Sequence, residues 1–181
     1  MADTGPNVLI ARERIEPRVD ELAARISADY AGVDELVVIG VLKGAFIFLA
    51  DLTRRLTVPH RVDFIAVSSY ADGHQRSGEV RLVLDLRESI EHRHVLLVED
   101  IVDTGRTLRY LVQQFEARDP ASVRTCALTR KKARNEGEIR IDYLGFDIPD
   151  VWVVGYGLDY AERHRTLPYI AALNPETLEL D

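Results

Sequence analysis

The sequence has little sulfur and no long apolar run. Its 181 residues include one cysteine, Cys126, so an internal disulfide bond is excluded. Because this cysteine lies in segment 123–128, which has the pattern of a strand, we predict that it packs in the core and does not act as a nucleophile. No apolar run approaches the roughly 20 residues of a membrane-spanning helix, and residues 1–6 do not resemble a signal peptide. These absences predict a cytoplasmic protein with no membrane partner.

The sequence also lacks a basic tract. It has 23 lysines and arginines against 30 acidic residues, which gives a net charge of −7 at pH 7. We therefore expect no nucleic-acid partner. His92 and His94 lie two residues apart, but no cysteine or third histidine accompanies them, so we expect no zinc site. With 46% hydrophobic residues, the chain is long enough for one domain with a sizeable core, and we predict that residues 1–181 form that domain.

Short apolar runs alternate with helical patterns along the chain. Runs of strand length occupy residues 8–10, 36–41, 62–67, 80–84, 95–98, 123–129 and 170–173. Helical spacing of apolar residues begins at about Glu16, with Pro17 in the first turn, and recurs from Phe46 and from Leu108. This order predicts a single α/β domain with a mostly parallel sheet flanked by helices.

The most informative stretch covers residues 95–108. Four apolar residues are typical of a strand buried on both faces, and Glu99 and Asp100 end this run. Asp103 follows, and then a loop of small and polar residues leads into a helix. The loop consists of Thr104, Gly105, Arg106 and Thr107. In an open α/β sheet, ligands bind at this carboxyl edge of the strands.

Each part of this stretch suits a different chemical group. Backbone N–H groups and hydroxyls of the loop 104–107, at a helix N-terminus, suit a phosphate monoester. Glu99 and Asp100 would repel phosphate, but they suit ribose hydroxyls or a hydrated Mg²⁺ ion. Asp103 lies between the two zones and could act as a general base. Any one of these residues could instead cap the helix, but capping needs only one. The set predicts a pentose 5-phosphate pocket.

The segment 99–107, Glu-Asp-Ile-Val-Asp-Thr-Gly-Arg-Thr, resembles the phosphoribosyl-pyrophosphate (PRPP) loop of type I phosphoribosyltransferases. It is most similar to the version in hypoxanthine-guanine phosphoribosyltransferases, and the resemblance runs from about residue 8 to residue 173. It implies a twisted sheet with a small hood, built from the N-terminal segment and residues from about 140 to 181. The implied reaction transfers the 5-phosphoribosyl group from PRPP to N9 of a 6-oxopurine. IMP or GMP and pyrophosphate are the products, Mg²⁺ is the cofactor, and Asp103 accepts or shares a proton at N7.

The resemblance also implies a pyrophosphate site. Leu42, Lys43 and Gly44 follow a buried strand and precede a helix, which is itself a phosphate-binding geometry. In the family this loop binds pyrophosphate and often contains a cis peptide bond, here between Leu42 and Lys43. Arg165 matches an arginine that contacts pyrophosphate. Glu99, Asp100 and Asp159 are the implied magnesium ligands, with Asp159 binding an ion carried by pyrophosphate.

Residues 141–160 resemble the purine-binding segment of the same family. Trp152 takes the aromatic position that stacks on the base, although by sequence alone it could equally pack in the core. The backbone of Val153 would contact the purine edge. An ungapped count back from Gly145 assigns Lys131 as the donor to the purine O6, and the adjacent Lys132 remains an alternative.

Ser69 and Tyr70 match the start of a loop that closes over the active site in the family. The following residues 71–79 are polar, contain glycines and show no periodicity, so a connection without any role is the alternative. Self-association as a homodimer or homotetramer is implied by the resemblance. The sequence does not rank hypoxanthine, guanine and xanthine. A second alternative is an RNA-binding regulator that senses nucleotides, which the acidic charge and the presence of Asp103 disfavour.

Overall fold

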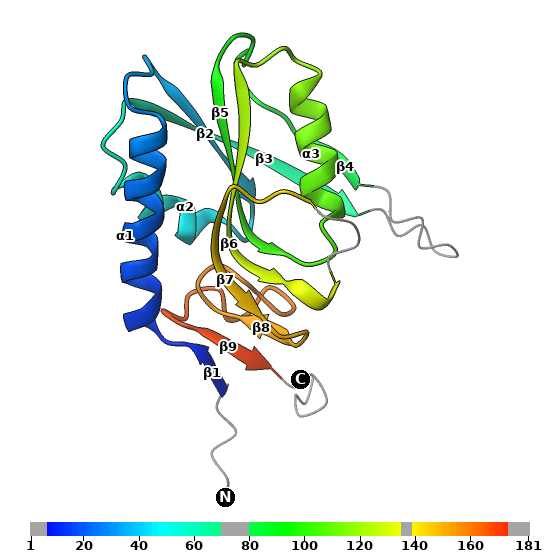
Figure 1. Ribbon diagram of the computed structural model, residues 1–181. Helices are drawn as coiled ribbons and strands as arrows, with labels where there is room; N and C mark the ends of the chain where they lie inside the picture. Colours follow the sequence, from blue (N-terminus) through cyan, green and yellow to red (C-terminus); the bar gives the residue numbers. More distant parts are fainter. Residues whose placement is uncertain (1–6, 70–79, 135–138, 174–181) are drawn as a thin grey trace, which may run out of the picture.

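The computed structural model describes residues 7–69, 80–134 and 139–173. The strands in these ranges are β1 (Asn7–Ile10), β2 (Leu36–Leu42), β3 (His60–Ser69), β4 (Val80–Leu84), β5 (His94–Val102), β6 (Ser122–Lys131), β7 (Tyr143–Ile148), β8 (Trp152–Val154) and β9 (Ile170–Leu173). The helices are α1 (Arg12–Asp29), α2 (Phe46–Thr53) and α3 (Arg106–Glu116), with a 3₁₀ turn at Lys132–Arg134. Figure 1 shows a large central sheet with a smaller sheet at one end.

The main sheet has six strands in the order β4-β3-β2-β5-β6-β7. All neighbours are parallel except β4, which runs antiparallel to β3. From β2 the chain continues on one side to β3 and later on the other side to β5, so a topological switch point lies between β2 and β5. Ligands bind at such points in open α/β sheets. The predicted mostly parallel sheet is confirmed.

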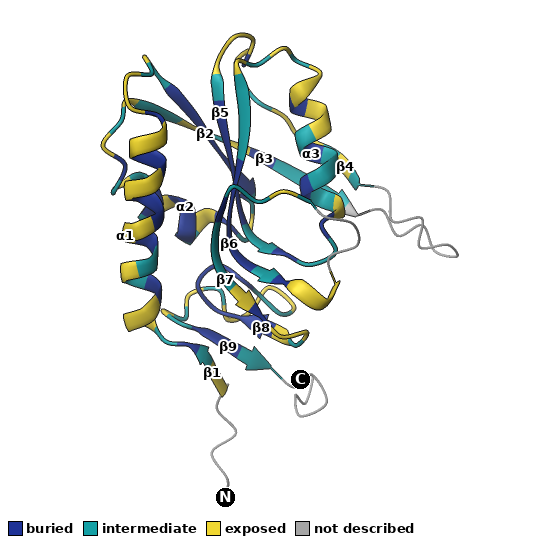
Figure 2. Cartoon of the chain, in the orientation of Figure 1, coloured by how far each residue is buried: buried dark blue, intermediate teal, exposed yellow. Residues whose placement is uncertain are grey.

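Helices cover both faces of the main sheet. In Figure 1, α1 and α2 lie on one side of the sheet and α3 on the other. Alternate residues of β5 belong to two apolar cores: Leu96 and Val98 pack with the α1 and α2 side, and Val95 and Leu97 with the α3 side. All four are fully buried, as Figure 2 shows for the centre of the sheet. Each such side chain contributes about 1.5–3 kcal/mol, which explains the continuous apolar run.

A second sheet joins the two ends of the described chain. It has three strands in the order β1-β9-β8, all antiparallel, and it lies at the lower end of the main sheet in Figure 1. It forms the small hood expected from the resemblance. The hood segment was expected from about residue 140, but β7 adds a strand to the main sheet, so only β8 and β9 come from that segment. That residues 1–181 form a single domain stays a prediction.

Two predicted boundaries were wrong. Helix α1 begins at Arg12 rather than at about Glu16, because the fully buried Ile15 already belongs to its apolar stripe. Pro17 therefore lies in the second turn, where it cannot donate a helical hydrogen bond. Strand β5 does not end at Glu99, because its backbone continues to pair with β6 as far as Val102.

Two features of composition can be compared with the structure. Cys126 is fully buried in β6, and burial raises the pKa of its thiol, so the prediction of a core cysteine is confirmed. Among the described residues, no helix has the length and apolar character needed to cross a membrane.

Candidate functional site at the carboxyl edge of the sheet

The carboxyl ends of β2 and β5 form a cavity of about 290 Å³. It is lined by Val41 and Leu42 at the end of β2, by Gly44 just after it, by Val67 of β3, and by the continuous segment 99–108. The cavity therefore brings together all seven residues predicted for phosphate and ribose binding. They are Glu99, Asp100, Asp103, Thr104, Gly105, Arg106 and Thr107.

The loop 104–107 turns the chain directly from β5 into α3. Gly105 is the N-cap residue with φ of 79°, a left-handed conformation that costs glycine little. The backbone N–H of Arg106 donates to the Thr104 hydroxyl at 3.4 Å, and α3 begins at Arg106. The first N–H groups of a helix have no partner within it and carry partial positive charge. The cavity thus contains a helix N-terminus suited to a phosphate group.

Glu99 and Asp100 form a pair of poorly solvated carboxyl groups beside this loop. Glu99 is only 5% exposed, and burial, with the adjacent Asp100, raises the pKa of its carboxyl well above the usual value. Burial also raises the pKa of Asp100 to about 6, although the N–H of Ile101 donates to its Oδ1 at 2.9 Å. A cation or hydrogen-bond donors would compensate this desolvation. Carboxylate oxygens are ligands that Mg²⁺ prefers, so the donor set fits a magnesium ion.

Two glycines bring separate loops against this pair. The Leu42–Lys43 peptide bond is cis, as the resemblance implied. A Cβ atom on Gly44 would lie 1.7 Å from Oδ2 of Asp100, so only glycine fits there. A Cβ atom on Gly157 would lie 2.0 Å from the carbonyl oxygen of Gly44. The segment after β8 is thus packed directly on the loop after β2.

That packing places the predicted Arg165 and Asp159 near Lys43. Arg165 donates to the carbonyl oxygen of Gly157 at 2.9 Å, and its Nη2 lies 2.8 Å from Oδ1 of Asp159. Glu162, which sequence reasoning missed, contacts both cations: its Oε2 lies 2.8 Å from Lys43 Nζ, and its Oε1 lies 3.1 Å from Arg165 Nη2. The Lys43 hydrogen bond and then Arg165 lower the pKa of Glu162. Nothing in the local sequence distinguishes this glutamate from an ordinary surface residue.

Asp103 lies at the centre of a second charged group. Its Oδ2 is 3.5 Å from Lys131 Nζ and 3.3 Å from Arg134 Nη1, and the same two cations contact Asp150 at 3.6 and 3.0 Å. The other carboxylate oxygen, Oδ1, is buried and has no hydrogen-bond partner among the described residues. A buried acceptor without a partner is unusual and suits a group that receives a proton from a ligand. Arg134 and Asp150 were not predicted.

The structure distinguishes the two candidate lysines. The side chain of Lys131 is 7% exposed and directed at Asp103, whereas Lys132 is exposed in the 3₁₀ turn. Lys131 Nζ also lies 5.9 Å from the centre of the Trp152 ring. These contacts favour Lys131 over Lys132 as the residue that faces a ligand.

Trp152 does not pack in the core, so that alternative was wrong. It is 59% exposed on β8 and contacts Tyr160 edge to face, with ring centres 6.0 Å apart. A large exposed aromatic ring near a buried lysine offers a surface on which a flat base can stack. The neighbouring Val153 is buried within the second sheet and pairs with Ala172.

The loop predicted to cover the site begins at the end of β3. Ser69 is the last residue of β3, while Tyr70 and residues 71–79 lie outside the described residues. Their conformation and role stay a prediction.

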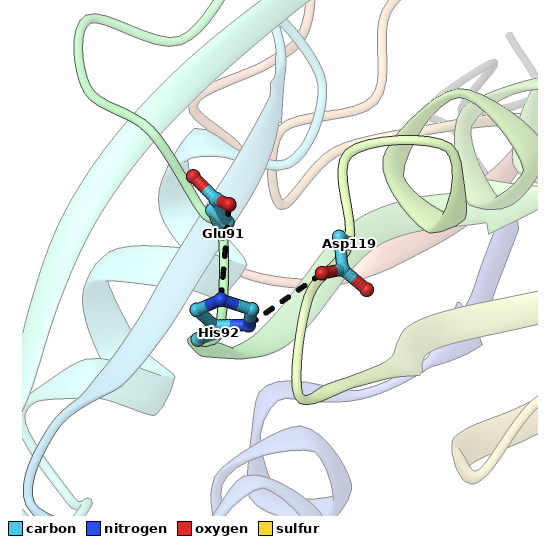
Figure 3. Close-up of side chains that lie close together, drawn as sticks. All are labelled: Glu91, His92 and Asp119. Atoms are coloured by element: carbon cyan, nitrogen blue, oxygen red, sulfur yellow. Dashed lines mark ion pairs between the residues drawn. The ribbon is translucent and has the colours of Figure 1, made fainter.

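The two histidines occupy different surroundings. Nδ1 of His94 lies 2.8 Å from the Ser122 hydroxyl oxygen. His92 lies between the exposed carboxylates of Glu91 and Asp119, at 3.7 and 3.6 Å, as Figure 3 shows. The two carboxylates contact opposite ring nitrogens of His92, whereas a single metal ion binds only one of these nitrogens. This group is therefore described as a surface cluster in which one imidazole lies between two carboxylates.

The sheet order and the loop at its switch point define an α/β protein that binds a phosphorylated sugar or nucleotide at its carboxyl edge. Comparison with known proteins is more specific. The sequence profile of the phosphoribosyl transferase domain matches residues 9–161. The hypoxanthine-guanine phosphoribosyltransferase of Bacillus subtilis is 45% identical over 172 residues, which cover 95% of each chain. The hypoxanthine phosphoribosyltransferase of Haemophilus influenzae is 44% identical over 91% of this chain and 93% of its own.

Solved structures agree with these relatives. Trypanosoma cruzi hypoxanthine phosphoribosyltransferase in complex with the product IMP has a TM-score of 0.89 at 45% identity, covering 98% of this chain and 99% of that one. A Bacillus anthracis hypoxanthine-guanine phosphoribosyltransferase has a TM-score of 0.87 at 41% identity, covering 93% and 98%. The chain belongs to the hypoxanthine-guanine phosphoribosyltransferase family.

Proposed function

We propose that this protein transfers the 5-phosphoribosyl group of PRPP to N9 of hypoxanthine or guanine, forming IMP or GMP and pyrophosphate. The observation that carries the proposal is the position of Asp103. It lines the phosphate-type cavity, its Oδ1 is buried without a partner among the described residues, and Lys131 lies 3.5 Å from its other oxygen. An acceptor and a donor side by side match N7 and O6 of a 6-oxopurine.

Two groups of residues hold the phosphoribosyl donor in this proposal. The loop 104–107 and the N-terminus of α3 bind the 5-phosphate, and Glu99 and Asp100 bind the ribose hydroxyls. Fixing the ribose in this way orients its C1 atom towards the base and reduces the entropy cost of reaction. The carboxylates also stabilise positive charge that develops on the ribose ring.

The purine is held and activated on the other side of Asp103. Trp152 stacks on the ring, the backbone of Val153 contacts its edge, and Lys131 donates to O6. Asp103 accepts or shares the proton at N7, which makes N9 more nucleophilic. General-base assistance of this kind typically accelerates a reaction by about 10²–10⁴-fold.

Cationic side chains from the loop after β2 and from the segment before β9 bind the leaving pyrophosphate. Lys43 and Arg165 contact its oxygens, and the backbone around Leu42 and Gly44 donates to it. The cofactor we propose is Mg²⁺: Glu99 and Asp100 would hold one ion, and Asp159 would hold a second ion carried by pyrophosphate. When bound, these ions would neutralise charge on pyrophosphate. Ser69 and Tyr70 would begin the loop that excludes water from the site.

We also propose that the protein acts in the cytoplasm as a homodimer or homotetramer. In support of self-association, four large apolar side chains of β3 and β4 are exposed: Val62 at 43%, Phe64 at 38%, Val83 at 62% and Leu84 at 45%. Val62, Phe64 and Leu84 line a surface cavity of about 550 Å³, which extends along β3 to Leu42 at the end of β2. Exposed apolar patches of this kind mark association surfaces.

A direct test measures pyrophosphate release from PRPP and Mg²⁺ with hypoxanthine, guanine, xanthine, adenine and uracil in parallel. We expect release with hypoxanthine or guanine, and the relative rates would rank the bases. Release with none of them, by a folded protein that still binds PRPP, would favour the RNA-binding regulator. Binding to structured RNA at rising salt concentration would then test that alternative.

The role of Asp103 is tested with Asp103→Asn. We expect turnover to fall by about 10²–10⁴-fold with PRPP affinity retained. Asp150→Asn is a matched control, because Asp150 contacts the same Lys131 and Arg134 but does not line the cavity. Equal turnover in the Asp103 variant and the wild-type protein would remove Asp103 from this role.

A further inference from the structure

Glu162 occupies an unusual position between two cations from different parts of the chain. One carboxylate oxygen contacts Lys43 Nζ at 2.8 Å, and the other contacts Arg165 Nη2 at 3.1 Å. One anionic group thus bridges the lysine after β2 and the arginine before β9. These are the two cations that we assign to pyrophosphate, so this inference rests on the proposed function.

The backbone holds Glu162 in this place. Tyr160 and Arg163 exchange backbone hydrogen bonds of 3.2 and 3.0 Å, which closes a tight turn. Ala161 and Glu162 are its central residues, with φ of 50° and 63°, the left-handed values of a type I′ turn. The N–H of Glu162 also donates to Oδ2 of Asp159 at 2.8 Å. The carboxylate is therefore presented to the two cations by a fixed turn and does not reach them from a distant loop.

We propose that Glu162 acts as an internal counter-anion that competes with pyrophosphate for Lys43 and Arg165. A bound pyrophosphate needs the N–H donors of the same two side chains, so it must share or replace the carboxylate. Glu162 therefore weakens the binding of both pyrophosphate and the pyrophosphate moiety of PRPP. After the transfer step, the carboxylate returns to the two cations and promotes release of the product.

The expected effect is moderate, because the carboxylate and one of its partners face solvent. The side chains of Lys43 and Glu162 are 67% and 65% exposed, while that of Arg165 is 17% exposed. Two partly exposed ion pairs correspond to a change of roughly three- to tenfold in binding. Glu162→Gln should therefore tighten pyrophosphate binding by this factor and lower KM for PRPP, without raising kcat.

The test is calorimetric titration of the whole protein with pyrophosphate in the presence of Mg²⁺. Glu21→Gln is the matched control: it removes one negative charge from a 60% exposed glutamate that pairs with Arg18 on α1. Glu162→Asp separates contact from net charge, because the charge remains but the shorter side chain no longer reaches both cations. We expect Glu162→Asp to bind more tightly than the wild-type protein and Glu21→Gln to bind equally.

Unchanged or weaker pyrophosphate binding by folded Glu162→Gln would overturn this inference. Weaker binding would mean that Glu162 orients Arg165 for its ligand, which is the opposite role. Failure of the proposed function gives a different result, because then the wild-type protein itself would bind no pyrophosphate. Thermal melting of each variant shows whether it is folded.

Discussion

Removal of the charge on Asp100 should stabilise the metal-free protein while it impairs activity. The carboxyl of Asp100 is packed against Gly44, and its Oδ1 accepts a hydrogen bond from the backbone N–H of Ile101. Asn keeps this acceptor and nearly the same shape. The substitution Asp100→Asn therefore removes a poorly solvated charge with little change in packing.

The size of the effect follows from the pKa of Asp100, which burial raises from 3.8 to about 6. A rise of about 2 in pKa corresponds to a free energy of about 3 kcal/mol that disfavours the ionised carboxyl in the folded protein. The side-chain NH₂ group of the new asparagine must find hydrogen-bond partners, which costs about 1 kcal/mol of stability. We expect a net gain of about 2 kcal/mol near neutral pH, or a rise in Tm of about 4–8 °C for a chain of this size.

The sign of the pH dependence is fixed by the direction of the shift. Between pH 3.8 and about 6 the folded protein retains a proton that the unfolded chain has released. Wild-type stability therefore falls as pH rises through this window, and the contribution of Asp100 to this fall is absent in Asp100→Asn. The advantage of the variant should be largest above about pH 7 and should nearly vanish at about pH 4.5.

The assay is thermal unfolding with a chelator at a series of pH values. Asp147→Asn is the control of opposite sign, because a hydrogen bond from Arg130 lowers the pKa of Asp147. That variant should lose a little stability, and its deficit should diminish as pH falls. If Asp100→Asn melts at or below the wild-type temperature near neutral pH, burial is not what governs this carboxyl group.

Two further predictions concern the neighbouring loops. Gly44→Ala should lose pyrophosphate binding and about 1–3 kcal/mol of stability, because its Cβ meets Asp100. Gly32→Ala has open space around its Cβ but a φ of 84°, so it should lose stability and keep activity, and similar activity in both variants would contradict this. Lys131→Gln should raise KM for the purine about 10–100-fold, because a lost hydrogen bond from a charged group costs this much binding. Lys132→Gln should change KM little. Steady-state kinetics that reversed this order would assign the role to Lys132.

The parts of the site that are continuous in sequence could be predicted well. Residues 95–107 contain the buried strand, the two carboxylates and the helix N-terminus, and each depends on local composition and spacing. The cavity accordingly contains every residue predicted from that stretch. The start of α1 was missed because Pro17 was assigned to the first turn, although Ile15 lies four residues before Val19 and continues the same apolar stripe.

The charged contacts could not be predicted, because they join residues far apart in sequence. Arg134 and Asp150 approach Asp103 only because β6 lies beside β5 in the sheet and β7 lies beside β6. Charged residues in loops are normally solvated, so composition gave no reason to single out these two. The same holds for Glu162, whose two partners lie on different segments.

The pyrophosphate end of the site depends on backbone contacts between loops rather than on the sheet alone. β2 and β5 are adjacent strands, so the sheet itself places Lys43 beside Asp100. The segment with Arg165 has no such strand to guide it. It is fixed by the close approach of Gly157 to the Gly44 carbonyl and by the Tyr156 hydroxyl, which donates to Asp51 of α2 at 2.5 Å. Because these contacts set the spacing of Lys43 and Arg165, both can reach one carboxylate, and by the same geometry one pyrophosphate.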